Sequence, residues 1–139
     1  MLLQQVAAEL ARHPAQQIPL ATLRPAAVLV PLFLREDEPW LLLTRRTEQL
    51  KKHSGEISFP GGGAEEQDSD FWQTALRETE EEVGVPPEMV RIVGRLDDYV
   101  TGTGFVVAPV VGMISPPYPV NPDPFEVADV FEAALIEGR

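Results

Sequence analysis

The chain has 139 residues, 44% of them hydrophobic, which is enough for one compact domain with its own core. Its 22 acidic residues outnumber the 11 basic ones, and the formal net charge of -11 excludes general binding to nucleic acid or to an anionic membrane. The absence of cysteine excludes disulfides, thiolate metal sites and cysteine nucleophiles.

The first predicted element is a helix over residues 2–11, where apolar residues recur at helical spacing until Pro14 stops the run. His13 lies at that stop, and we expect it to be exposed rather than a ligand. No apolar stretch is long enough to cross a bilayer, and the N-terminus lacks the pattern of a signal peptide. We therefore expect a cytoplasmic protein.

Two apolar runs, residues 26–34 and 40–44, are predicted to form strands joined by a polar turn. A charged loop is expected over residues 45–56, and the glycine-rich segment 59–63 is expected to be irregular. A mixed α/β domain is predicted, because a central helix and three later strands follow. Asp68 or Ser69 is expected to cap the helix, which is expected to end at Val83. The strands are expected to cover residues 90–96, 105–114 and 126–131. A proline-rich loop is expected over Ser115–Pro124.

The predicted central helix carries a cluster of glutamates. At about 100° per residue, Glu78, Glu81 and Glu82 share one face, whereas Glu80 points away from them. Such oxygen ligands suit Mg²⁺ or Mn²⁺. For the helix by itself, an ordinary solvated acidic face is the more frequent outcome. The opposite side, expected to pack on the sheet, carries Trp72, Leu76, Thr79 and Val83.

The glycines upstream of this helix favour a functional interpretation, because glycine lets the backbone approach a ligand closely. The segment Arg77–Val85 resembles the second half of the Nudix box, the signature of the Nudix hydrolases. The resemblance implies that Glu78, Glu81 and Glu82 bind the metal and that Arg77 braces the turn between loop and helix. The first half of the box departs from the pattern, since its glutamate position holds Asp68 or Ser69, and Asp68 is the expected partner of Arg77.

A second motif precedes the box. Residues Leu42 to Gly62 resemble the additional motif of coenzyme A pyrophosphatases, with every spacing kept, although Thr47 and Lys51 replace the usual residues. The basic residues here would hold the substrate's phosphates. A solvated loop is the alternative interpretation. By this resemblance the substrate-binding residues are Arg45, Arg46, Lys51, Gly61 and Gly62.

The resemblance covers residues 26–135 and implies a single Nudix domain, an α/β/α sandwich with a mixed sheet. Residues 1–24 are expected to form the N-terminal helix and lead-in, and residues 25–139 the core. Family members continue for several tens of residues further, so the C-terminal part is expected to be short or missing. We expect such a domain to expose apolar surface, which a homodimer would cover.

The implied activity is metal-dependent hydrolysis of coenzyme A or its derivatives to 3′,5′-ADP and 4′-phosphopantetheine or its acyl form, with Mg²⁺ or Mn²⁺ as cofactor. A further carboxylate commonly acts as general base or extra ligand in the family, and Glu126 is the candidate. Two alternatives remain open. One is a Nudix hydrolase for another diphosphate such as ADP-ribose, and the other is a catalytically weak module that binds a nucleotide.

Overall fold

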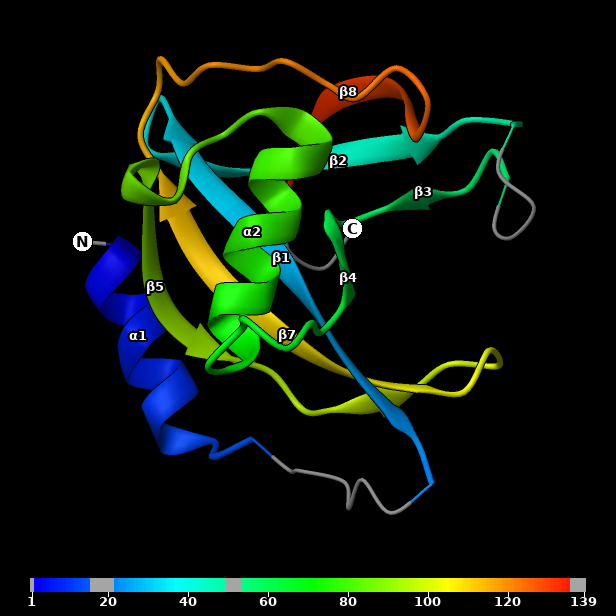
Figure 1. Cartoon of the computed structure of the whole chain (residues 1–139). Helices are drawn as coiled ribbons and strands as arrows, with labels where there is room; N and C mark the ends of the chain where they lie inside the picture. The colour runs from blue at the N-terminus through cyan, green and yellow to red at the C-terminus, as the bar shows by residue number, and fades with distance from the viewer. Residues whose placement is uncertain (1, 16–21, 50–53, 136–139) are drawn as a thin grey trace.

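The computed structural model describes residues 2–15, 22–49 and 54–135, and it arranges two helices around a mixed β-sheet (Figure 1). The helices are α1 (Leu2–Arg12) and α2 (Phe71–Val83), and a 3₁₀ turn, η1, covers Pro87–Met89. Neither helix has the length and apolar character needed to cross a membrane within the described residues. The strands are β1 (Arg24–Arg35), β2 (Glu38–Arg46), β3 (Ile57–Ser58), β4 (Gly61–Gly63), β5 (Val90–Arg95), β6 (Tyr99–Val100), β7 (Phe105–Ile114) and β8 (Val127–Ala134).

The long strand β1 organises the sheet. It pairs in parallel with β7 along one edge, from Arg24 opposite Phe105 to Leu32 opposite Met113. Its other edge pairs antiparallel with β4 near its start and with β2 near its end. The main path runs β3-β2-β1-β7-β5, with β8 attached to β2 and β6 attached to β7. The predicted mixed sheet is therefore confirmed.

The pleat of β1 directs alternate side chains to the two faces of the sheet. Ala27 and Leu29 form a buried cluster with Ala75 of α2. Val28 and Val30 point the other way and line a groove of about 600 Å³ together with Leu10 of α1 and residues of β5, β7 and the neighbouring loops. The two helices therefore lie on opposite faces, which confirms the predicted α/β/α sandwich.

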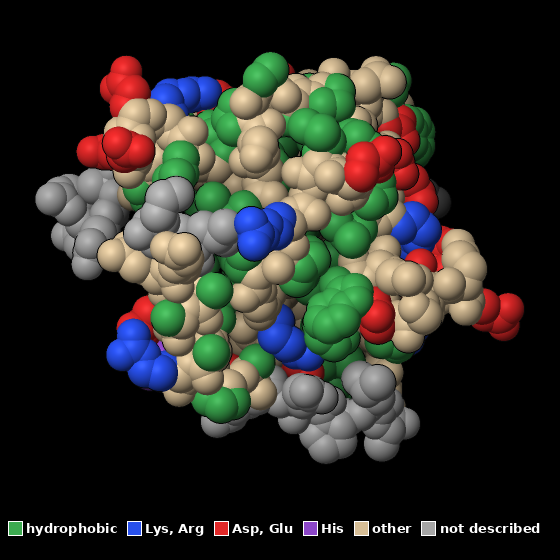
Figure 2. Space-filling view, turned by 90° about the vertical axis from the view of Figure 1, so that its left-hand side faces the viewer, with side chains coloured by type: hydrophobic (Ala, Val, Ile, Leu, Met, Phe, Trp, Pro, Cys, Tyr) green, Lys and Arg blue, Asp and Glu red, His purple; other side chains and the backbone are tan. Residues whose placement is uncertain are grey.

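The face that carries α1 remains partly apolar. Leu96 and Tyr99, both on this groove, are 45% and 47% exposed, and the adjacent Val100 is 49% exposed. Figure 2 views the molecule from the left-hand side of Figure 1, and hydrophobic side chains reach that surface between acidic and basic ones. The homodimer and the division of the chain at residue 24 stay predictions.

The longer elements agree with the sequence predictions, and β7 matches its predicted bounds. The prediction of irregular backbone over residues 59–63 was wrong for Gly61–Gly63, which form β4. Glycine permits this pairing because a Cβ at Gly61 would lie only 2.6 Å from the Cα of Val28. The strands β3 and β6 were not predicted, since two residues are too short for a periodic pattern.

Candidate active site

Helix α2 has well-defined ends. Asp70 is the N-cap, and its side chain accepts a hydrogen bond from the Gln73 N–H at 2.9 Å, so the predicted cap at Asp68 or Ser69 was wrong by one or two residues. The helix ends at Val83 as predicted. Gly84 adopts a φ of 84°, and a Cβ there would lie 2.6 Å from the backbone nitrogen of Asn121.

The buried side of α2 agrees with the prediction at Thr79 and Val83 but differs elsewhere, and Leu76 is only half-buried. Trp72 was expected to pack on the sheet, but it lies in the first helical turn, meets the ring of Phe71 edge-on and is 45% exposed. Glu82 lies on the buried side and is only 4% exposed. Glu80 is exposed. The buried residues of the helix are Thr74, Ala75, Thr79, Glu82 and Val83.

The carboxylate of Glu82 is bound to the glycine strand. Its Oε2 accepts a hydrogen bond from the Gly61 N–H at 3.0 Å. Burial raises the pKa of Glu82 to about 8, and the negative charges of Glu78 and Glu126 add to this effect. Burial also raises the pKa of Glu78, whose carboxyl group is hydrogen-bonded to that of Glu82. Two acidic groups with raised pKa values therefore lie side by side.

Gly62 makes room for this pair. A Cβ at Gly62 would lie 2.7 Å from the carboxyl carbon of Glu78. Any larger residue would push the Glu78 carboxyl group aside or move β4 away from the helix. Gly61 and Gly62 thus both bring the backbone close to the helix glutamates, and their predicted part in substrate binding stays a prediction.

Arg77 connects the loop before α2 to the helix. Its Nε and Nη2 donate to the two carboxylate oxygens of Asp68 at 3.1 and 3.0 Å, and Nη2 also donates to the Gly63 carbonyl at 3.1 Å. The side chain of Asp68 is 4% exposed and that of Arg77 is 17% exposed. The guanidinium group holds the pKa of Asp68 well below its usual range. The expected Arg77–Asp68 pair is therefore present.

Glu81 occupies a different position from the other two helix glutamates. Its side chain is 58% exposed, and Oε2 accepts a hydrogen bond from Nη1 of Arg77 at 3.0 Å. Nη1 also donates to Glu78 at 3.1 Å. As the side chains stand, no group of three acidic or histidine residues in the described ranges surrounds a single metal position. The structure thus brings Glu78 and Glu82 together and links Glu81 to them through Arg77.

The chemistry of these groups nevertheless fits a divalent cation. Glu78 and Glu82 offer hard oxygen donors, and a nearby cation would offset the burial and repulsion that raise both pKa values. Glu126 lies close enough for its charge to act on Glu82. Glu78 and Glu82 therefore lie together, Glu81 would need a change of side-chain conformation to join them, and the metal-binding role of all three stays a prediction.

The basic residues of the upstream motif separate into two environments. Arg45 pairs with Asp129 of β8, with its Nε donating at 3.0 Å. Arg46 points to the other face of β2, the same side as the buried Leu42, which packs against Val83 of α2. The Nε of Arg46 is buried and lacks a hydrogen-bond partner within the described part of the chain. Lys51, the third predicted basic contact, lies outside the described residues.

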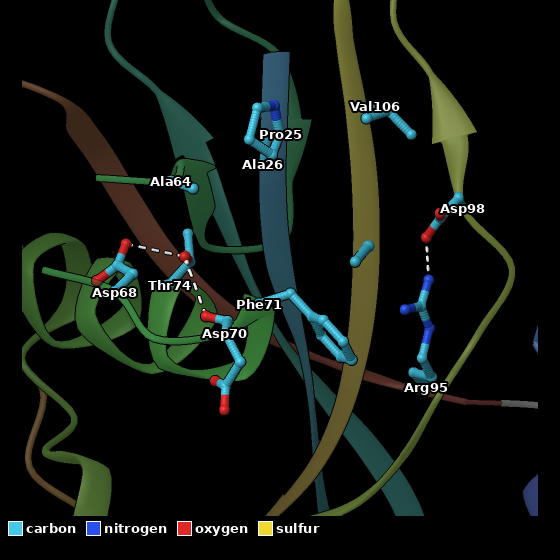
Figure 3. A pocket seen from close by; sticks show the side chains of 11 residues that line it. Pro25, Ala26, Ala64, Asp68, Asp70, Phe71, Thr74, Arg95, Asp98 and Val106 are labelled. Atoms are coloured by element: carbon cyan, nitrogen blue, oxygen red, sulfur yellow. Dashed lines mark hydrogen bonds and ion pairs between the residues drawn. The ribbon is translucent and has the colours of Figure 1, made fainter. Parts of the chain in front are cut away.

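A separate cavity of about 280 Å³ lies at the other end of α2 (Figure 3). Its walls include Phe71 and Thr74 on the helix side and Arg95 and Asp98 beyond β7, and Thr74 donates a hydrogen bond to Asp68 at 2.8 Å. Glu78 and Glu82 do not line this cavity. It therefore adjoins the brace formed by Asp68 and Arg77 rather than the glutamate pair.

Known proteins resemble this chain in sequence. The family model described as NUDIX domain matches residues 23–131. The Nudix hydrolase NudL of Cronobacter sakazakii, named as uncharacterized, is 49% identical over 82% of this chain and 59% of its own length. NudL of Pectobacterium atrosepticum is 45% identical over 89% of this chain and 64% of its own length. The chain thus spans less than two thirds of these curated relatives.

Solved structures share the fold. An Ap4A hydrolase of C. elegans, crystallised as a binary complex, superposes with a TM-score of 0.67 at 22% identity and covers 78% of each chain. The NUDIX domain of Shewanella oneidensis NrtR, in complex with ADP ribose, gives a TM-score of 0.61 at 20% identity over 91% of this chain and 82% of its own. At these identities the likeness concerns the fold alone.

Proposed function

The chain belongs to the Nudix family, and from that membership we propose that it is a metal-dependent pyrophosphohydrolase that cleaves the diphosphate of coenzyme A or its derivatives. The observation that carries this proposal is the hydrogen bond from the Gly61 N–H to Glu82. Gly61 lies in the last part of the upstream motif that resembles coenzyme A pyrophosphatases, and Glu82 belongs to the acidic helix. The bond joins the part proposed to recognise the substrate to the part proposed to bind the metal.

In this proposal Glu78 and Glu82 hold the divalent ion, Mg²⁺ or Mn²⁺, and Glu81 joins them by leaving Arg77. When bound, the ion neutralises the diphosphate oxygens and lowers the pKa of an attacking water molecule. Glu126, whose charge acts on Glu82, accepts a proton from that water. Arg77 remains bound to Asp68 and keeps the glycine strand at its position beside the helix.

Among the described residues, Arg46 is the side chain that we propose to contact a phosphate of the substrate. Its buried Nε lacks a hydrogen-bond partner among them, and an unpaired buried donor is costly. A phosphate oxygen would satisfy it with a charge-assisted hydrogen bond. Arg45 is already neutralised by Asp129, so its contribution to substrate binding is expected to be smaller. A local cation is needed because the chain as a whole repels phosphate with its net charge of -11.

The experiment is a substrate comparison. Purified protein is incubated with coenzyme A and Mg²⁺ or Mn²⁺, with ADP-ribose in parallel, and the products are identified by mass. We expect 3′,5′-ADP and 4′-phosphopantetheine from coenzyme A. Faster turnover of ADP-ribose would reject the coenzyme A assignment, and no turnover of either compound by a folded sample would reject the enzymatic function in favour of a binding module.

Two arginine variants test the recognition half of the proposal. Arg46→Gln is expected to raise KM for coenzyme A about tenfold, because one charge-assisted hydrogen bond to phosphate is lost. Arg45→Gln makes the same chemical change one residue away and is expected to raise KM less. A larger effect of Arg45→Gln would show that the phosphate lies on the β8 side instead.

A further inference from the structure

The segment that carries Glu126, residues 121–127, is tied to the end of α2 by its backbone. The Asn121 N–H donates to the Val83 carbonyl at 2.7 Å, and the Asp123 N–H donates to the Glu82 carbonyl at 2.9 Å. The last carbonyls of a helix have no partner within the helix, so these bonds satisfy them. This end of the segment is therefore fixed relative to Glu82.

The other end of the segment is fixed by Thr47, the residue that follows β2. Its N–H donates to the Glu126 carbonyl at 3.0 Å, and its hydroxyl group donates to the Phe125 carbonyl at 2.6 Å. Thr47 itself is 6% exposed. The Phe125 side chain is 58% exposed, so packing of that ring does not hold the segment in place.

We propose that Thr47 is a positioning residue for the active site, whose hydroxyl group fixes the backbone that directs Glu126 toward Glu82. The N–H groups of Glu126 and Val127 both donate to the Asp123 carbonyl, at 3.2 and 2.8 Å, so the peptide groups on either side of Glu126 are held on their N–H side, and Thr47 binds their carbonyl side. Two bonds to the successive carbonyls of Phe125 and Glu126 fix both peptide groups, and with them the direction of the Glu126 side chain. The influence of the Glu126 charge on Glu82 agrees with this arrangement.

This inference rests on the proposed function, and a double-mutant cycle tests it. The variants are Thr47→Val, Thr47→Ser, Glu126→Gln and the combination of Thr47→Val with Glu126→Gln. Thr47→Val keeps the shape and the backbone N–H but removes the hydroxyl group. We expect kcat to fall about tenfold with KM within twofold, because a misdirected catalytic group costs turnover rather than binding.

A merely structural role would not reproduce the other expected results. Thr47→Ser restores the hydroxyl group and should restore kcat. In the Glu126→Gln background, Thr47→Val should cause no further loss, because the group that it positions is already disabled. Thr101→Val is the matched control, since the Thr101 hydroxyl group bonds only within the turn between β6 and β7 among the described residues. An equal loss in that control, additive losses in the cycle, or full activity of Glu126→Gln would overturn the proposal.

Amide hydrogen exchange separates this proposal from the proposed function. Residues 121–127 should exchange about tenfold faster in Thr47→Val than in wild type or Thr47→Ser, because one of the bonds that hold them is gone. This holds even if the wild type cleaves no diphosphate, in which case the proposed function fails and the positioning role stands. Unchanged exchange in Thr47→Val would overturn the positioning role itself.

Discussion

Two acidic side chains near opposite ends of α2 have pKa values that are shifted in opposite directions. Near the start of the helix, Asp68 is fully paired with Arg77, and its pKa lies well below its usual range. Near the end of the helix, the buried Glu82 is paired with a backbone N–H and another carboxyl group, and its pKa is raised to about 8. The first carboxylate is therefore held in its charged form by Arg77, whereas the second favours its protonated form, and a bound cation would favour its charged form.

This contrast teaches that burial alone does not identify a functional carboxylate. The two carboxyl groups differ in their partners. Asp68 is bound by the guanidinium group of Arg77, whereas no Lys or Arg among the described residues pairs with Glu82. Substitutions at Glu82, Asp68 and Gly62 test whether the two sites differ in this way.

The largest effect is expected from Glu82→Gln. Glutamine can still accept the Gly61 N–H but cannot supply a negative charge to a metal, so kcat should fall about 10²- to 10³-fold, as for removal of other electrostatic contacts to a transition state. The unfolding temperature should not fall, because a buried acidic group is removed. Glu80→Gln, the same change at an exposed position of the helix, should keep kcat within twofold. Full turnover by Glu82→Gln at limiting Mg²⁺ would reject the ligand assignment.

Asp68→Asn should act on stability instead. It removes the carboxylate that accepts from Nε and Nη2 of Arg77, and we expect a loss of about 2 kcal/mol in the free energy of unfolding, measured by urea denaturation at pH 7. The lowered pKa of Asp68 means that its contribution is present above its unfolded pKa of 3.8 and is lost as the pH falls through the folded value. The difference between wild type and variant should therefore shrink in acid. Asp70→Asn, which keeps an N-cap, should cost little.

Gly62→Ala tests the close approach of β4 to the glutamate pair. The added methyl group would lie 2.7 Å from the Glu78 carboxyl carbon, so the side chain must move. We expect about tenfold weaker Mg²⁺ or Mn²⁺ binding by calorimetry, with stability nearly unchanged. Gly102→Ala adds the same group where nothing lies within 4 Å, and it should leave the affinity as it is. Equal affinities in the two variants would contradict the proposed geometry.

The smallest expected effect is on the pH dependence of the unfolding temperature, measured with and without metal. Because the pKa of Glu82 is raised from 4.5 to about 8 on folding, its contribution to stability is fully present below pH 4.5 and is lost as the pH rises through 8. Without metal, the unfolding temperature should fall more in wild type than in Glu82→Gln between pH 6 and 9. Added Mg²⁺ should reverse this fall. Parallel curves for the two proteins would show that Glu82 does not titrate in this range.

Much of the fold was readable from local patterns. The apolar run at residues 105–114 predicted β7 with its observed bounds, and Gly84 predicted the end of α2. The predicted strand at residues 126–131 is longer in the structure, because β8 gains its last residues by pairing with β2. The short strand of Gly61–Gly63 was missed, since glycine carries no β-strand preference and its pairing depends wholly on β1.

The candidate site was predictable as a set of residues but not as an arrangement. Helical spacing grouped three glutamates, yet the structure distinguishes the buried Glu82 from the exposed Glu81. The motif grouped Arg45 with Arg46, yet strand pleating sends them to opposite faces. Thr47 stood out in the sequence only as a replacement within the motif, and its link to Glu126 was not visible because its partners are 78 and 79 residues away.

The sequence by itself determined which elements form, which family the chain resembles and which acidic residues share a helix, because these depend on spacing within one segment. Only the tertiary structure decided that the pKa of Asp68 is lowered while that of Glu82 is raised. It also placed Glu126 near Glu82. The reason is that a carboxylate's pKa depends on burial and on charges brought close by sheet register and loop closure, and neither is encoded in the spacing of neighbouring residues.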